Sequence, residues 1–160
     1  MAGQLRPEGL DFVHTAPVRF AFAREISAAP SAVFHELAED VPGWTTWFSA
    51  VTSARPIDDG ARREIRLRGG VRAEETILTA KEAEVYAYRV DAINVPGIRA
   101  MVEEWRLAPA GTGTRVQWTV AADGAAPFRL LLRSARPGMG LAFRNAVTTL
   151  DRRVAGRGRS

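Results

Sequence analysis

The C-terminal part of the chain carries an apolar stripe with the period of a helix. Its members recur at intervals of three and four residues: Met139, Phe143, Val147, Leu150 and Val154. An apolar face of this length needs an equally long apolar surface to cover it. Residues 127–155 are therefore predicted to be helical, with one long helix packed against the rest of the domain.

Pro137 interrupts this helical region, because proline cannot donate a backbone hydrogen bond and disfavours helical geometry in the residue before it. Phe128, Leu131 and Leu132 are therefore expected to belong to a separate short segment. The break is predicted at Pro137-Gly138, which would also be the hinge if the domain opens to admit a ligand.

Upstream, the apolar positions alternate, as they do in strands with one buried face. In residues 18–26, Phe20 and Phe22 share one side, and a helix is predicted to begin at Pro30 or Ser31. Further alternating segments are separated by turn residues: Asp58-Asp59-Gly60, Gly69-Gly70, Pro96-Gly97 and Gly111-Thr112-Gly113. One strand, short helices, about six more strands and a long helix predict an α+β domain with an antiparallel sheet.

Length and composition support a single domain. A chain of 160 residues, 46% apolar and 25% charged, is ordinary for a globular protein. The sequence predicts a flexible leader over residues 1–17, one domain over 18–155 and a disordered tail over 156–160. Cysteine, a signal-peptide pattern and a transmembrane-length apolar run are all absent from the sequence, so we expect a cytoplasmic protein.

The net charge of +4 comes from the C-terminal end. Eight arginines lie from Arg129 onward, where Asp151 is the only acidic residue. A basic helix surface could contact an anionic membrane or nucleic acid. We favour a solvated helix surface, because Lys81 is the only lysine and an arginine-rich composition indicates GC-rich coding. No nucleic-acid partner is therefore expected.

Several segments resemble the START-like, helix-grip superfamily, also called SRPBCC, and within it the polyketide cyclase/dehydrase and lipid-transport group. Residues 24–34, REISAAPSAVF, are similar to the strand-to-helix signature of that group. The other matching positions are Asp40, Trp44, Trp47-Phe48 and residues 75–77, 86–90 and 113–116. The resemblance implies a curved antiparallel sheet of about seven strands wrapped around the C-terminal helix, short helices after the first strand, and a cavity between sheet and helix.

The resemblance also implies a small hydrophobic ligand in that cavity. The side chains that would line it come from the family's cavity mouth, from strand alternation and from the apolar stripe of the C-terminal helix. The candidate ligand-binding residues are Trp44, Trp47, Phe48, Ile65, Leu67, Ile77, Tyr86, Tyr88, Trp105, Trp118, Met139, Phe143 and Val147. Aromatic side chains at the cavity mouth could stack on a flat apolar ligand or gate its entry. The alternative is that such residues, Trp47 among them, serve only packing.

Three candidate catalytic residues emerge from the same alternation. Glu103 shares a face with Met101 and Trp105, so its carboxyl is expected to point inward, where desolvation would raise its pKa. Arg63 could pair with Glu103 or bind a ligand carboxylate, and Tyr88 could orient or protonate a ligand carbonyl. The alternative places these side chains at strand ends in solvent or in purely structural pairs.

No metal or cofactor is expected. His14 and His35 lack a second ligand at metal spacing, the glycine clusters do not match nucleotide-binding loops, and no serine lies in a nucleophile-elbow pattern. Two functions remain. The first is binding of an aromatic, polyketide or lipid-like molecule, and the second is a polyketide aromatase/cyclase or dehydratase acting on a chain folded in the same cavity. The sequence does not indicate a cluster of polar catalytic residues, which favours the binding function.

Overall fold

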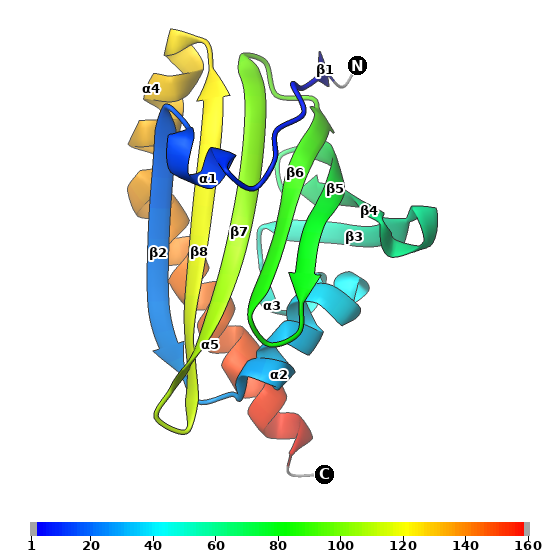
Figure 1. The fold of residues 1–160 in the computed structure, drawn as a ribbon, viewed down its shortest axis with the longest axis vertical. Helices are drawn as coiled ribbons and strands as arrows, with labels where there is room; N and C mark the ends of the chain where they lie inside the picture. The colour runs from blue at the N-terminus through cyan, green and yellow to red at the C-terminus, as the bar shows by residue number, and fades with distance from the viewer. Residues whose placement is uncertain (1–2, 159–160) are drawn as a thin grey trace.

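A computed structural model describes residues 3–158 (Figure 1). The strands are β1 (Gly3–Gln4), β2 (Val18–Ile26), β3 (Val51–Ile57), β4 (Arg62–Leu67), β5 (Val71–Lys81), β6 (Val85–Ile93), β7 (Ile98–Ala110) and β8 (Gly113–Gly124). The α-helices are α1 (Phe12–Thr15), α2 (Pro30–Phe34), α3 (Trp44–Trp47), α4 (Ala126–Ser134) and α5 (Arg136–Arg157). A π-helix, η1 (His35–Glu39), and two 3-10 helices, η2 (Val41–Gly43) and η3 (Asp58–Gly60), complete the described elements.

The sheet joins segments that are far apart in the sequence. Its order is β2-β8-β7-β6-β5-β4-β3, and β1 pairs with β6 beside this path. β2 pairs antiparallel with β8 from Val18 opposite Ala122 to Ile26 opposite Thr114. β2 and β3 lie at opposite edges, so the helices between them cross from one edge to the other. The predicted α+β class, with a seven-strand antiparallel sheet and a long C-terminal helix, is confirmed.

α5 packs along the inner face of the sheet, and Figure 1 shows it running diagonally behind the strands. Phe143, Val147 and Leu150 are buried there, with Met139 and Val154 partly buried beside them. The ring of Phe143 stacks on that of Trp118 from β8, with a centroid distance of 6.1 Å. The apolar stripe predicted from the sequence is therefore the face of α5 that contacts the sheet.

Asp151 ties the C-terminal half of α5 to the connection after β2. Its carboxylate accepts hydrogen bonds from the backbone N–H of Ser27 at 3.0 Å and of Ala28 at 2.8 Å, and from the Ser27 hydroxyl at 2.8 Å. Half a turn further on, Arg153 forms an ion pair with the fully buried Glu36 of η1 at 3.3 Å. These contacts fix the helix relative to the segment that leads to α3.

The N-terminal segment departs from the flexible leader expected over residues 1–17. β1 pairs with the end of β6, and α1 buries Phe12 and Val13 on the outer face of the sheet. The side chains beneath them are Ala100, Val102 and Ala121. These side chains of β7 and β8 are apolar, and covering them removes apolar surface from water.

The described range leaves out residues 1–2 of the expected leader and residues 159–160 of the expected tail. Gly156 and Arg157, also assigned to the tail from the sequence, continue α5 instead.

The C-terminal helical region consists of two helices, and the break between them lies at Ala135 rather than at Pro137-Gly138. Pro137 belongs to the first turn of α5, where a residue without an N–H loses no intrahelical hydrogen bond. Phe128 is buried and anchors the separate segment α4. Ala135 itself keeps right-handed helical dihedral angles, φ −80° and ψ −8°, so the two helices follow one another closely.

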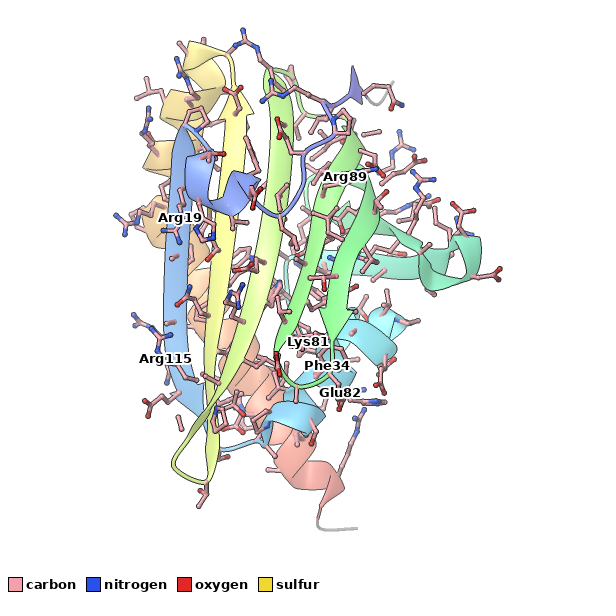
Figure 2. The ribbon with its side chains drawn as sticks, viewed as in Figure 1. Arg19, Phe34, Lys81, Glu82, Arg89 and Arg115 are labelled. Atoms are coloured by element: carbon pink, nitrogen blue, oxygen red, sulfur yellow. The ribbon has the colours of Figure 1, made fainter. Side chains whose placement is uncertain are left out.

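Charged side chains lie at the edge and at a turn of the sheet. Figure 2 shows Arg19 and Arg115 at the β2–β8 edge of the sheet, and Lys81 and Glu82 at the turn between β5 and β6. Ionisable side chains on the inner face of the sheet define the candidate site.

Candidate functional site

A cavity of about 240 Å³ lies between the inner face of the sheet and the first half of α5. α5 contributes Met139 and Ala142 to its wall, one turn before Phe143 and Val147 close the contact with the sheet. The small side chain of Ala142 leaves space that a larger residue would fill. Most of the remaining wall is apolar, with four ionisable groups: Arg63, Glu75, Tyr88 and Glu103.

Arg63 and Glu75 form a buried ion pair in this wall. The two residues are direct partners on the adjacent strands β4 and β5, so their side chains emerge on the same face. Arg63 Nε donates to Glu75 Oε1 at 2.6 Å, and the side chains are only 3% and 6% exposed. Arg63 Nη1 is also buried and has no hydrogen-bond partner within residues 3–158. The N–H groups of this one nitrogen therefore have no acceptor among the described residues.

Aromatic rings enclose the guanidinium of Arg63. Its Cζ lies 3.9 Å from the ring centroid of Tyr88 and 4.5 Å from that of Trp44. The negative faces of these rings stabilise a cation that water cannot reach. Burial opposes the charge, but Glu75 and the two nearby tyrosines outweigh it, so the pKa of Arg63 lies above its ordinary value. Arg63 is therefore positively charged at neutral pH.

Glu103 stands at the centre of a hydrogen-bonded chain. Trp118 Nε1 donates to Glu103 Oε1 at 2.8 Å, and the Tyr88 hydroxyl donates to the same oxygen at 3.1 Å. Trp105 Nε1 in turn donates to the Tyr88 oxygen at 3.2 Å. Glu103 keeps some accessible surface where it lines the cavity, although it lies deep below the outer surface of the protein.

The pKa values of Glu103 and Tyr88 indicate different roles for these two hydrogen-bonded groups. Burial, with a further contribution from the charge of Glu75, raises the pKa of Glu103 to about 7, because Trp118, Arg63 and Tyr88 oppose the shift only in part. Burial and the neighbouring Glu103 raise the pKa of Tyr88 well above its ordinary value. Glu103 can therefore exchange a proton near neutral pH, whereas Tyr88 stays protonated and positions the carboxyl.

Glu75 has a raised pKa as well, again because of burial, and the charge of Arg63 opposes this shift. The two carboxyls thus share one nearby cation. Neutral Glu103 has a hydrogen-bond donor at the cavity wall, and the guanidinium of Arg63 in the same wall supplies a positive charge. The arrangement is suited to hold an oxygen acceptor at the end of an otherwise apolar pocket.

The structure places part of the predicted site residues at the cavity. The predicted residues that line it are Trp44, Phe48, Arg63, Ile65, Leu67, Tyr88, Glu103, Trp118 and Met139. The predicted residues that lie in the surrounding core instead are Trp47, Ile77, Tyr86, Trp105, Phe143 and Val147. Trp47, for example, packs on Trp44 with ring centroids 4.6 Å apart. Strand alternation chose the correct face of the sheet, but it could not tell the cavity wall from the packed core. The binding and catalytic roles themselves stay predictions.

Glu75 is the functional candidate that sequence reasoning missed. The sequence pattern could have identified Glu75, because alternation along β5 puts its side chain on the same face as those of Ala73 and Ile77. The other lining residues without a sequence-based assignment are Ala50, Val51, Ala73, Val90, Ile93, Met101 and Ala142. Most are small or aliphatic, and nothing local distinguishes them from ordinary core residues.

Within residues 3–158, no group of three or more histidines, aspartates or glutamates is arranged to hold a metal ion. No helix in the same range is long and apolar enough to cross a membrane.

Comparisons with known proteins agree on the family. The family model described as polyketide cyclase/dehydrase and lipid transport matches residues 17–155. An uncharacterized protein of Mycobacterium tuberculosis is 30% identical over 149 residues, which cover 90% of this chain and 89% of that protein.

Solved structures share the fold at low sequence identity. The protein XoxI from Bacillus cereus superposes with a TM-score of 0.70 at 13% identity, covering 86% of this chain and 96% of that one. A START superfamily protein from Mycobacterium smegmatis gives a TM-score of 0.67 at 11% identity, with coverage of 86% and 97%. With the family model matching nearly all of the sheet and α5, the chain belongs to the polyketide cyclase/dehydrase and lipid transport family.

Proposed function

We propose that the protein binds a compact, largely apolar molecule in the cavity between the sheet and α5, and that an oxygen acceptor of this molecule meets Arg63 and Glu103. The observation that carries the proposal is the cavity of about 240 Å³ with its mostly apolar wall. Apolar clefts with a few convergent polar groups are the usual form of small-molecule sites. Family membership supports the same ligand class.

The size and polarity of the cavity limit the kinds of ligand that fit it. Ligand pockets typically measure about 300–1,000 Å³, so this one suits a compact molecule better than a long acyl chain. Arg63 Nη1 lacks a partner within the described residues, and an oxygen of the ligand would satisfy it. An aromatic ring could at the same time contact Trp44 and Trp118, which lie in the wall.

A matched pair of substitutions on α5 tests the proposal. Ala142→Phe puts a ring into the cavity wall, whereas Ala155→Phe puts the same ring on the exposed side of the same helix. Anilinonaphthalene sulfonate, an aromatic probe with an acidic oxygen group, would be titrated against each variant by fluorescence. We expect Ala142→Phe to weaken binding by at least about tenfold and Ala155→Phe to leave it unchanged. Equal binding by wild type and Ala142→Phe, with both folded by circular dichroism, would refute the proposal.

A second candidate function is cyclisation or dehydration of a polyketide chain, and the raised pKa of Glu103 favours it. As a carboxylate, Glu103 could take a proton from the carbon between two ketones, and that carbon would then bond to another carbonyl carbon of the chain. The new alkoxide would regain a proton from Glu103, held by Trp118 and Tyr88.

Glu103→Gln separates the two functions, because glutamine keeps the acceptor for Trp118 and Tyr88 but cannot exchange a proton. A carrier would retain probe binding in this variant. An enzyme would lose turnover of a poly-β-ketone test substrate by about 100-fold or more, followed as product formation by mass spectrometry. If wild type leaves the substrate unchanged while binding it, the enzymatic candidate fails and the carrier stands.

A further inference from the structure

Exposed leucines gather on the C-terminal helices. Within residues 3–158, the exposed large apolar side chains are Leu10, Leu130, Leu131 and Leu141. Leu130 is 67% exposed and Leu131 is 65% exposed, both on α4, and Leu141 on α5 is 56% exposed. A single exposed leucine is common on protein surfaces, but a group of them usually marks a contact surface.

α4 and α5 follow one another closely, because Ala135 between them keeps helical dihedral angles. Leu141 shares a surface pocket with Arg136 and Arg144 near the start of α5. Leu130 and Leu131 lie between Arg129 and Arg133 on α4. Figure 1 shows α4 at one end of the molecule, on the far side of the β2–β8 edge in this view, with α5 continuing from it behind the sheet. We call the surface formed by Leu130, Leu131 and Leu141 with their neighbouring arginines the α4–α5 surface.

The charged side chains of α4 and of the first part of α5 have a single sign. Residues 124–150 contain Arg129, Arg133, Arg136 and Arg144 and no acidic residue. Arg133, Arg136 and Arg144 are exposed, and Arg129 is half-buried. Two of them are held in place, Arg133 by a hydrogen bond to the Pro17 carbonyl at 3.4 Å and Arg136 by the ring of Phe20, 5.6 Å from its Cζ. Cations and leucines are therefore interleaved on the surface at fixed positions.

We propose that the α4–α5 surface docks the protein on an anionic membrane. Leucines on an interfacial helix enter the boundary between headgroups and acyl chains, while arginines bind lipid phosphates. Each arginine near an anionic leaflet adds attraction of its own. Both features are needed for this partner and both are on this surface.

Other partners fit less well. A second copy of the chain, packed symmetrically on the same surface, would bring the arginines of both copies together, and like charges in contact are unfavourable. Nucleic acid would use the arginines but leave the leucines without a role, since phosphate contacts are made by polar and charged groups. The combination therefore favours a lipid surface.

Docking in this way would also place the cavity near the membrane. Met139 and Ala142 line the cavity, and Leu141 lies between them in the sequence on the opposite, exposed side of the same helical turn. One helix would then separate the lipid from the cavity. The inference does not depend on cavity binding, because the surface and the cavity can be altered separately.

Flotation with lipid vesicles tests the inference. Full-length protein would be mixed with vesicles of phosphatidylcholine alone or of phosphatidylcholine with phosphatidylglycerol. We expect wild type to float only with the anionic vesicles, and added salt to weaken this binding. Leu130→Ser with Leu131→Ser should reduce partitioning by at least about tenfold. Arg133→Gln with Arg144→Gln should reduce it by about 30-fold.

The matched control is Arg66→Gln with Arg72→Gln, which removes the same charge from exposed positions on β4 and β5. This variant should bind anionic vesicles like wild type. Equal loss in the control would show non-specific attraction and overturn the inference, as would failure of wild type to float. A wild-type dimer by size-exclusion chromatography that Leu130→Ser with Leu131→Ser dissociates would overturn it in favour of self-association. Circular dichroism would check that every variant is folded.

Discussion

Nε of Arg63 donates to Oε1 of Glu75 at 2.6 Å within the wall of the cavity, and almost no surface of either side chain is exposed. A buried ion pair contributes little net stability, because the attraction only offsets the loss of water around both charges. The main effect of this ion pair is to fix the position of the Arg63 side chain. The pair holds Arg63 between the rings of Trp44 and Tyr88, with Nη1 left without a partner among the described residues.

Removing both members of this pair should cost less stability than the sum of the two single removals. Arg63→Met or Glu75→Leu alone leaves a buried charge unpaired, and we expect a loss of about 3–5 kcal/mol in the free energy of unfolding. The double variant should lose less than the sum of the single variants. Urea denaturation of all four proteins measures this coupling, and additive losses would contradict the prediction. Arg55→Met serves as the control, because Arg55 pairs with Glu64 at 2.7 Å while 63% exposed, and should cost no more than about 1 kcal/mol.

Glu103 should make stability depend on pH in a defined window. Its pKa is about 7 in the folded protein against an ordinary 4.5, so between these values the folded state holds a proton that the unfolded state has released. Stability from this group is therefore present below pH 4.5 and falls as pH rises to about 7. Glu103→Gln stays neutral throughout, so its stability relative to wild type should increase by about 3 kcal/mol across the window. Urea denaturation at intervals of pH measures the difference, and a constant difference would show that the carboxyl is not desolvated.

Gly113 should tolerate no side chain, although its dihedral angles are not the reason. A Cβ at this position would lie 1.9 Å from the carbonyl oxygen of Ile26, on the neighbouring strand β2. Backbone atoms in a paired strand cannot move aside, so Gly113→Ala should lower the free energy of unfolding by about 3 kcal/mol or more. Gly138→Ala is the control, because no atom lies within 4 Å of its Cβ and the position is helical. It should be neutral or stabilise by up to about 1 kcal/mol. Thermal unfolding of both variants would settle the comparison.

Asp151 should stabilise the attachment of α5 to the β2–α2 connection. Asp151→Ala removes the acceptor for the backbone N–H groups of Ser27 and Ala28 and for the Ser27 hydroxyl. The loss should be about 2 kcal/mol, as for charge-assisted hydrogen bonds elsewhere. Asn145→Ala, at an exposed position on the same helix, should change stability by less than about 0.5 kcal/mol. Similar values for the two variants in chemical denaturation would contradict the role given to Asp151.

Elements with one buried face were readable from the sequence. Phe20 and Phe22 predicted a strand over 18–26, and the structure has β2 at Val18–Ile26. The stripe from Met139 to Val154 likewise predicted the face of α5 that meets the sheet. In both cases the period of the apolar residues is the period of the backbone, so the local pattern and the buried face coincide.

Elements held by distant contacts were not readable. α1 is a short helix that forms where Phe12 and Val13 meet apolar side chains of β7 and β8, and its own sequence has no helical period. The break at Ala135 likewise depends on how Phe128 anchors α4, whereas Pro137 alone pointed to a later position. Short helices gain most of their stability from tertiary packing, and this packing is absent from the local pattern.

The sequence by itself determined the class of the fold, the inward direction of Arg63 and Glu103, and the absence of cysteine chemistry, because alternation and composition are properties of the chain. Tertiary structure alone decided that Arg63 pairs with Glu75 rather than with Glu103, and that Trp118 and Tyr88 hold Glu103. It also decided that a cavity remains beside Ala142 while Phe143 and Val147 close the contact further along α5. Strand register selects ion-pair partners, and the spacing between helix and sheet sets the cavity, and neither quantity is encoded in any one segment.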